Sequence, residues 1–182
     1  MPSGDQYTYG TYSNANTQIN GDVSRSGCVS VRASSSNRDD IVFDIGSKEK
    51  TESDGCNGHF ALAIMDASHV TIYGMCLSYD NNNIALTQSI LHDGSFHQLC
   101  VTYDTNTRYL CVYLDLLPPV CLTRTNARYN TGLGDVRIGW WPDNNRQFDA
   151  TGGGLIRALS LFNTTINQAC VNYLYQTNII SG

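Results

Sequence analysis

The chain contains 182 residues, of which 15% are charged, and its formal net charge at pH 7 is −5. This length suits one domain with a sizeable core, and the low charge content argues against a coiled coil or a charge-driven disordered tail. The negative charge argues against nucleic acid and anionic membranes as partners. No apolar run approaches the roughly 20 residues that span a bilayer, so direct membrane insertion is not expected.

The composition favours strands over helices. The only glutamates are Glu49 and Glu52 and the only lysines are Lys48 and Lys50, although these residue types usually fill exposed helix faces. The chain has 11 tyrosines and many threonine, valine, isoleucine and asparagine residues, which are typical of strands joined by turns. We therefore predict an all-β protein.

The Tyr-, Asn- and Thr-rich residues 1–21 are expected to form an edge strand or a tether, and residues 22–182 a single domain. Alternating apolar residues separated by turn residues indicate a series of short strands, which is typical of an antiparallel β-sandwich or jelly roll. The predicted strands cover residues 28–33, 41–45, 60–64, 70–72, 99–103, 109–114, 136–140 and 155–162.

One helix is predicted, over Ile166–Tyr175, with Thr164 or Thr165 as its N-cap. A helix with one apolar stripe would lie against the sandwich. The stripe is expected to contain Ile166, Ala169, Cys170, Tyr173 and Leu174. Cys170 is interpreted as a free buried thiol, with an intermolecular disulfide as the alternative.

A hairpin is predicted between the strands at 60–64 and 70–72, turning at about Asp66. This turn places Cys56 opposite Cys76, ten residues away on either side. The same register makes one apolar face, pairing Phe60 with Ile72 and Leu62 with Val70.

Two further cysteine pairs follow from the strand pattern. Cys111 and Cys121 flank a bend centred on Leu116, and Cys28 and Cys100 lie on the polar sides of their strands, where they could meet. Three such pairs favour disulfides and an extracellular location over the alternative of reduced core thiols in the cytosol. A metal site of cysteine and histidine is not indicated, because C-x-x-C is absent and the four histidines show no ligand spacing.

Two segments resemble a known superfamily. Residues 96–104, reading FHQLCVTYD, and the strand at 110–115 resemble the central strands of the concanavalin A-like laminin-G/pentraxin superfamily, most closely pentraxins. Residues 136–139 and 154–163, with the closing helix, resemble its final block. The resemblance covers roughly residues 22–176 and implies a jelly-roll sandwich, a Cys28–Cys100 disulfide and a structural packing role for His97.

The same resemblance implies calcium binding, with departures. Asp143 can be carried over as a ligand and Asp149 aligns with a later carboxylate, while Asp54 is a further candidate. The family's Glu-Gln pair is absent, since Trp141 and Pro142 precede Asp143 here. Calcium takes six to eight oxygen ligands, so the pattern predicts at most a weak single-ion site. The alternative is that these aspartates only form turns.

The segment Trp140–Asp149 is the predicted ligand-binding loop, because sugars stack on tryptophan and hydrogen-bond to amide and guanidinium groups. Ile138 and Trp140 share strand parity, so Trp141 is expected to be exposed; the alternative is that the second Trp packs under the N-terminal segment. The candidate ligand-binding residues are Trp141, Asn144, Asn145, Arg146 and Gln147.

The sequence predicts a non-enzymatic extracellular recognition or adhesion module that binds a glycan or an extracellular protein, with calcium and oligomer formation as further expectations. Alternating catalytic carboxylates and a Gly-x-Ser-x-Gly motif are both absent, which counts against the alternative of a glycan-processing enzyme. A purely structural or oligomerising ectodomain is the third hypothesis.

Asn163 begins the one N-glycosylation sequon. Because Met1–Asp5 do not resemble a signal peptide, an exported protein is expected to be a mature fragment of a longer chain.

Overall fold

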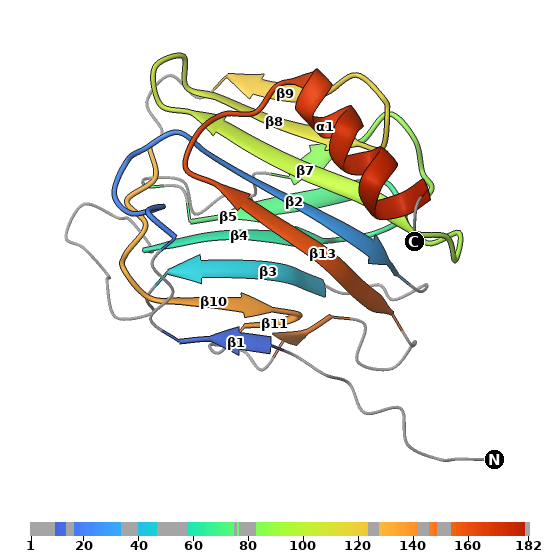
Figure 1. The fold of residues 1–182 in the computed structure, drawn as a ribbon, viewed down its shortest axis with the longest axis horizontal. Helices are drawn as coiled ribbons and strands as arrows, with labels where there is room; N and C mark the ends of the chain where they lie inside the picture. Colours follow the sequence, from blue (N-terminus) through green and yellow to red (C-terminus); the bar gives the residue numbers. More distant parts are fainter. Residues whose placement is uncertain are drawn as a thin grey trace.

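The computed structural model describes residues 10–13, 17–33, 40–46, 58–74, 76, 83–123, 128–141, 146–148 and 154–180. These residues form two sheets packed face to face, with a helix outside them (Figure 1). All strand pairs in the described part of the chain are antiparallel. No helix in this part of the chain is long and apolar enough to cross a membrane.

The first sheet has six strands, and the second has five. In spatial order the first contains β1 (Gly10–Tyr12), β10 (Asp135–Ile138), β3 (Asp40–Gly46), β4 (His59–Ile64), β5 (His69–Tyr73) and β6 (Asn83–Ala85). The second contains β13 (Leu155–Phe162), β2 (Arg25–Arg32), β7 (His97–Asp104), β8 (Tyr109–Leu114) and β9 (Val120–Thr123). A separate short hairpin is formed by β11 (Trp140–Trp141) and β12 (Arg146–Gln147).

The core lies between the two sheets and is built by alternate residues of their strands. Val29, Val31, Leu99 and Val101 of the second sheet are each at most 1% exposed. The sheets approach closely at Gly27, where a Cβ atom would stand 2.6 Å from the Phe43 ring. The apolar residues that alternate in the sequence therefore lie on the face of each strand that points into this core.

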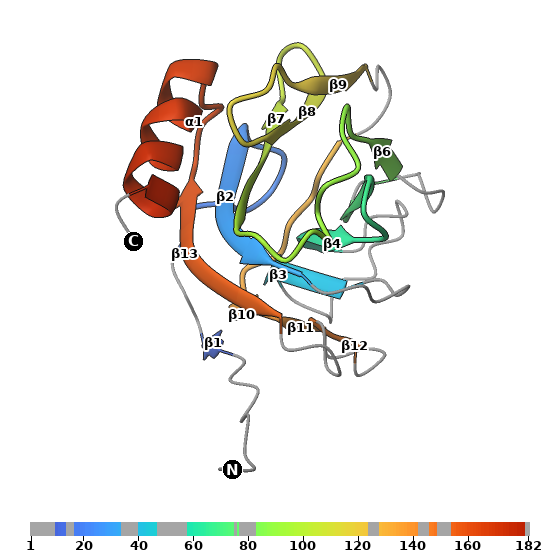
Figure 2. The ribbon, with the colours of Figure 1, turned by 90° about the vertical axis from the view of Figure 1, so that its right-hand side faces the viewer.

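The helix covers the outer face of the five-stranded sheet (Figure 2). It runs as α1 from Gln168 to Tyr175 and continues as a π-helical turn, Gln176–Ile180. The predicted threonine caps are wrong, because the Asn167 side chain accepts a hydrogen bond from the Cys170 backbone N–H at 3.0 Å. The predicted stripe is also wrong in part, since Ala169 and Tyr173 are exposed and Val171 is buried instead.

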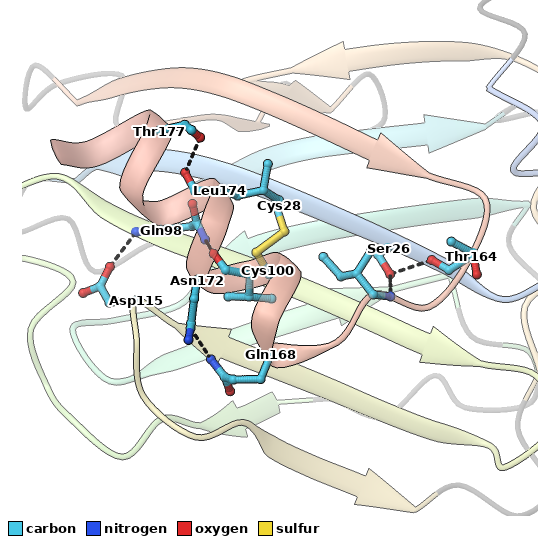
Figure 3. Close-up of a disulfide and its surroundings, with 12 residues drawn as sticks. Ser26, Cys28, Gln98, Cys100, Asp115, Thr164, Gln168, Asn172, Leu174 and Thr177 are labelled. Atoms are coloured by element: carbon cyan, nitrogen blue, oxygen red, sulfur yellow. Dashed lines mark hydrogen bonds between the residues drawn. A yellow bond between two sulfur atoms is a disulfide. The ribbon is translucent and has the colours of Figure 1, made fainter. Parts of the chain in front are cut away.

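The disulfides follow the predicted pairing where the structure describes both cysteines. Cys28–Cys100 and Cys111–Cys121 are confirmed. Figure 3 shows the first of them beneath the helix. Both of its cysteines belong to an apolar cluster that also contains Ile166 and Val171. Cys76 is disulfide-bonded, and its predicted partner Cys56 lies outside the described residues. Cys170 is free as predicted, but it is half-buried rather than buried.

The predicted hairpin register is wrong by two residues, because Leu62 pairs with Ile72 and Ile64 with Val70. The turn is therefore centred one residue later than expected. The Asp66 carboxylate accepts a hydrogen bond from the Ser68 backbone N–H at 2.7 Å, and the Met65 N–H donates to the His69 carbonyl at 2.9 Å. Cys56–Cys76 stays a prediction that this register does not support by itself.

His97, at the start of β7, lies between two carboxylates. Its Nδ1 is 2.8 Å from Asp115 Oδ2 and its Nε2 is 3.0 Å from Asp93 Oδ1, while the residue is only 6% exposed. The hydrogen bond with Asp115, followed by the one with Asp93, raises the pKa of His97 against the opposing effect of burial. The histidine thereby connects the turn before β7 with the end of β8.

We expect the free energy of unfolding to decrease as the pH rises above about 6.5, because the unfolded histidine loses its proton near that pH while the folded one keeps it to a higher pH. The folded pKa is raised, so this contribution is complete below the unfolded pKa and disappears as the pH passes the folded one. Urea unfolding across this range should give a flatter profile for His97→Gln. His69→Gln is the control, since His69 is 42% exposed and solvent screens its Asp66 contact. An unchanged profile in His97→Gln would contradict the assignment.

Candidate functional site

The short hairpin of β11 and β12 contains four residues of the predicted ligand-binding loop and lies beside β3 of the six-stranded sheet. Trp140 pairs with Gln147 and Trp141 with Arg146. Gly139, with φ at +78°, turns the chain out of β10 before the hairpin. The Gly139 N–H donates to the Val42 carbonyl at 3.0 Å, and the Gly139 carbonyl accepts from the Phe148 N–H at 2.7 Å. These two bonds fix the hairpin to β3 and close its base.

The parity argument for Trp141 is wrong in its premise, because Gly139 interrupts the strand between Ile138 and Trp140. Trp140 is half-buried, and its Nε1–H donates to Thr11 Oγ1 of β1 at 3.1 Å. The first tryptophan therefore lies against the N-terminal edge strand. A glycine between two strand-like segments is the feature of the sequence that could have indicated this break.

The structure places only part of the predicted site. Trp141, Arg146 and Gln147 belong to the hairpin backbone, and nothing is described of their side chains. The remaining predicted ligand and calcium residues lie outside the described residues: Asn144, Asn145, Asp143, Asp149 and Asp54. Their roles stay predictions. No group of three or more His, Cys, Asp or Glu side chains in the described ranges is placed to hold a metal.

A groove of about 500 Å³ opens beside the hairpin, between the edges of the two sheets. Tyr12 of edge strand β1 is 64% exposed there. The groove is otherwise mainly aliphatic, and its lining consists of Tyr12, Val136, Ile138, Ile156, Arg157, Ala158, Leu159 and Leu161. No pattern in the sequence predicted this groove.

An irregularity in β13 shapes the groove. The pairing of β13 with β2 shifts register between Arg157 and Ser160, and Ala158 has φ at +56°. A bulge of this kind bends a strand and leaves backbone groups outside the regular ladder. β13 is also the end strand of its sheet, so its outer edge has no strand partner in the described sheet.

The groove and the hairpin are continuous. Ile138 lines the groove and is followed by Gly139 and Trp140. A Cβ atom on Gly139 would stand 3.6 Å from Cδ1 of Ile156, a groove residue on the opposite sheet. The two features thus form one surface, which we call the β1–β13 edge.

A buried ionic cluster in the six-stranded sheet offers little for catalysis. Asp44 is fully buried, with Oδ1 2.9 Å from His59 Nδ1 and Oδ2 accepting from Arg137 Nη1 at 2.6 Å. His59 is 3% and Arg137 7% exposed. Since both oxygens of Asp44 are engaged and all three residues are buried, the cluster holds β10, β3 and β4 together rather than facing a substrate.

No protein-family model matches this chain, and no curated protein matches it. Solved structures share its fold. The CBM40 of the Ruminococcus gnavus IT-sialidase, bound to α2,3-sialyllactose, is 12% identical over 90% of this chain and 91% of that one, with a TM-score of 0.66. A heptameric SAP-like pentraxin from Limulus polyphemus is 12% identical over 90% and 76%, with a TM-score of 0.60.

A structure of botulinum neurotoxin type C is 10% identical and also has a TM-score of 0.60. It covers 96% of this chain, which spans only 41% of the toxin chain. These neighbours are jelly-roll sandwiches, so the predicted fold class is confirmed. The pentraxin neighbour supports the resemblance in part. At such low identity the likeness shows the fold alone.

Proposed function

We propose that this chain is a non-catalytic glycan-recognition module whose ligand binds along the β1–β13 edge. The observation that carries the proposal is the groove itself, with the exposed Tyr12 in its lining and the tryptophan hairpin beside it. Aromatic rings and apolar walls accept the C–H faces of a sugar. The outer edge of β13, which has no strand partner in the described sheet, offers backbone groups to sugar hydroxyls.

The structural neighbours support this proposal. One is a CBM40 bound to sialyllactose, and another is a toxin whose cell entry depends on two ganglioside molecules. A binding domain of botulinum neurotoxin DC in complex with SialylT has the same fold, with a TM-score of 0.56. Together with the edge groove, these neighbours favour recognition over the alternative of a glycan-processing enzyme.

We expect Tyr12→Ala to weaken binding of glycans found on an array by about tenfold, because an aromatic stacking contact contributes roughly 1.5 kcal/mol. The free energy of unfolding should change by less than about 1 kcal/mol, since the side chain is 64% exposed. Calorimetry with the array's best neutral saccharide measures the loss. Tyr173→Ala is the matched control, because Tyr173 is 65% exposed on α1. Equal affinities for Tyr12→Ala and the unmodified protein would refute the groove site.

A second variant tests whether the hairpin of β11 and β12 takes part in binding. Trp141→Ala should abolish saccharide capture while changing stability by less than about 1 kcal/mol. Unfolding of the variant would place Trp141 in the core and remove it from the site.

We also propose that Asp143, Asp149 and Asp54 supply a weak calcium site. Binding to the native state alone must raise stability. The thermal midpoint should therefore be higher in millimolar calcium than in chelator, and an unchanged midpoint would refute the site.

An extracellular location is proposed on the two described disulfides, since such bonds persist in oxidising compartments. Asn163 is exposed at the end of β13, as an N-glycan requires, and its Nδ2 donates to Gln18 Oε1 at 3.0 Å. Its glycosylation remains a proposal that mass spectrometry of the secreted protein can test.

A further inference from the structure

Two arginines and one phenylalanine meet on the outer face of the five-stranded sheet. Arg32 ends β2 and pairs with Leu155 of β13, while Arg157 pairs with Ser30 two positions along. Phe96 immediately precedes β7, whose His97 pairs with Val31. Since residues two apart on a strand share a face, Arg32, Arg157 and Phe96 lie on the same side of the sheet.

The two guanidinium groups stack on the same ring. Arg157 Cζ lies 3.9 Å and Arg32 Cζ 5.6 Å from the centre of the Phe96 ring. All three residues are half-exposed. A guanidinium that stacks on a ring keeps its fork of N–H donors available for a ligand. We call these three residues the arginine pair on Phe96.

The arginine pair has no carboxylate partner in the described part of the chain, which distinguishes it from Arg108 and Arg137. Arg108 pairs with Asp22 at 2.7 Å and Arg137 with Asp44 at 2.6 Å. Within the described residues, the pair makes one long hydrogen bond, from Arg157 Nε to Ser30 Oγ at 3.5 Å. The carboxylates of Asp93 and Asp115, near in sequence to Phe96 and β8, are engaged by His97.

Two like charges on one ring repel each other, so an arrangement of this kind is more favourable with an anion between the guanidiniums. Guanidinium forks bind planar or tetrahedral oxyanions through paired, charge-assisted hydrogen bonds. The net charge of the chain is −5, so this local positive site has the opposite sign to the protein as a whole. Arg157 also lines the groove, which places the pair next to the β1–β13 edge.

We propose that Arg32 and Arg157 bind the oxyanion, a carboxylate or a sulfate, of an acidic saccharide, with Phe96 fixing both guanidiniums. The inference rests on the glycan-recognition function proposed above. It narrows that function from glycans in general to acidic ones, and it predicts that binding weakens with added salt.

The test compares lactose with 3′-sialyllactose and with 3′-sulfolactose, which add a carboxylate sugar or a sulfate to the same disaccharide. Calorimetry should show a preference for the acidic probes. Arg157→Gln and Arg32→Gln should each lower affinity for them by about tenfold or more. Arg32→Gln, whose residue does not line the groove, should leave lactose binding unchanged. Arg128→Gln, which removes the same charge from an exposed arginine, is the control. Phe96→Leu keeps both charges and should still weaken acidic binding.

A second readout follows the arginine Nε–H resonances by NMR during titration with each probe and with sodium sulfate. Shifts at Arg32 and Arg157 support the site. Equal affinity for lactose and the acidic probes, or equal losses in Arg157→Gln and Arg128→Gln, would overturn it while leaving glycan recognition standing. If no saccharide binds but sulfate still shifts both resonances, glycan recognition fails and the oxyanion site stands. Unmoved resonances with every anion overturn the site.

Discussion

Replacing Cys28 and Cys100 together by alanine is expected to lower the free energy of unfolding by about 4 kcal/mol. The bond joins residues 72 apart, so reduction or removal releases a long loop in the unfolded chain. Both cysteines are fully buried in the cluster beneath α1, so the substitution would also remove the disulfide on which the helix packs. Urea unfolding of the double variant measures the loss.

Cys111→Ala with Cys121→Ala is the matched comparison. This bond closes a loop of residues only 10 apart, Cys111 is half-buried and Cys121 is exposed. Its removal should cost about 3 kcal/mol or less. A larger loss in this double variant than in the first would contradict the loop-length account. Circular dichroism of both variants shows whether α1 remains in place.

The strand pattern could be predicted because one face of each central strand is buried in a continuous core. β7 and β8 alternate along their whole length, and their partners follow in register, with Cys28 opposite Cys100. Period-two alternation records that burial directly. Cys28 and Cys100 then fall on the face beneath the helix, and Cys111 lies opposite Cys121 on the next pair of strands, which is why the strand pattern identified two confirmed disulfides.

The errors lie where the backbone departs from regular geometry. Gly139 at positive φ ends the parity of β10, and the turn at Asp66 shifts the hairpin register by two residues. The prediction of the apolar stripe on the helix was wrong for a different reason. An eight-residue helix has few apolar positions, and its orientation on the sheet decided that Val171 rather than Tyr173 is buried.

The candidate groove could not be read from the sequence, because its walls come from segments that are distant in the chain. Tyr12, Ile138 and Ile156 are brought together only by the pairing of β1 with β10 and by the packing of the two sheets. The arginine pair on Phe96 has the same origin. Neither feature contains a local motif, so the topology had to be known first.

Besides the Cys28–Cys100 disulfide, Arg25 is the position whose replacement should most reduce the free energy of unfolding. Nothing in the sequence indicated that this charged residue is buried. It begins β2 and is fully buried. Nε donates to the Val23 carbonyl at 2.9 Å and Nη2 to the Gly21 carbonyl at 2.5 Å, while Nη1 donates to Thr131 Oγ1. Its Cζ lies 5.3 Å from the Tyr129 ring centre. Burial lowers the pKa of Arg25 to about 10, so the group stays charged at neutral pH.

Arg25→Ala is expected to lower the free energy of unfolding by about 3–5 kcal/mol, because it leaves a cavity and deprives Thr131 Oγ1 and two backbone carbonyls of their donor. Arg25→Lys keeps the charge but loses the fork, and should cost less; it also gives a foldable variant if alanine prevents folding. Arg108→Ala is the control, since Arg108 is 31% exposed and its ion pair with Asp22 should contribute about 1 kcal/mol or less. Urea unfolding of the three variants ranks them. Equal losses in Arg25→Ala and Arg108→Ala would show that the buried guanidinium does not hold this end of the sandwich together.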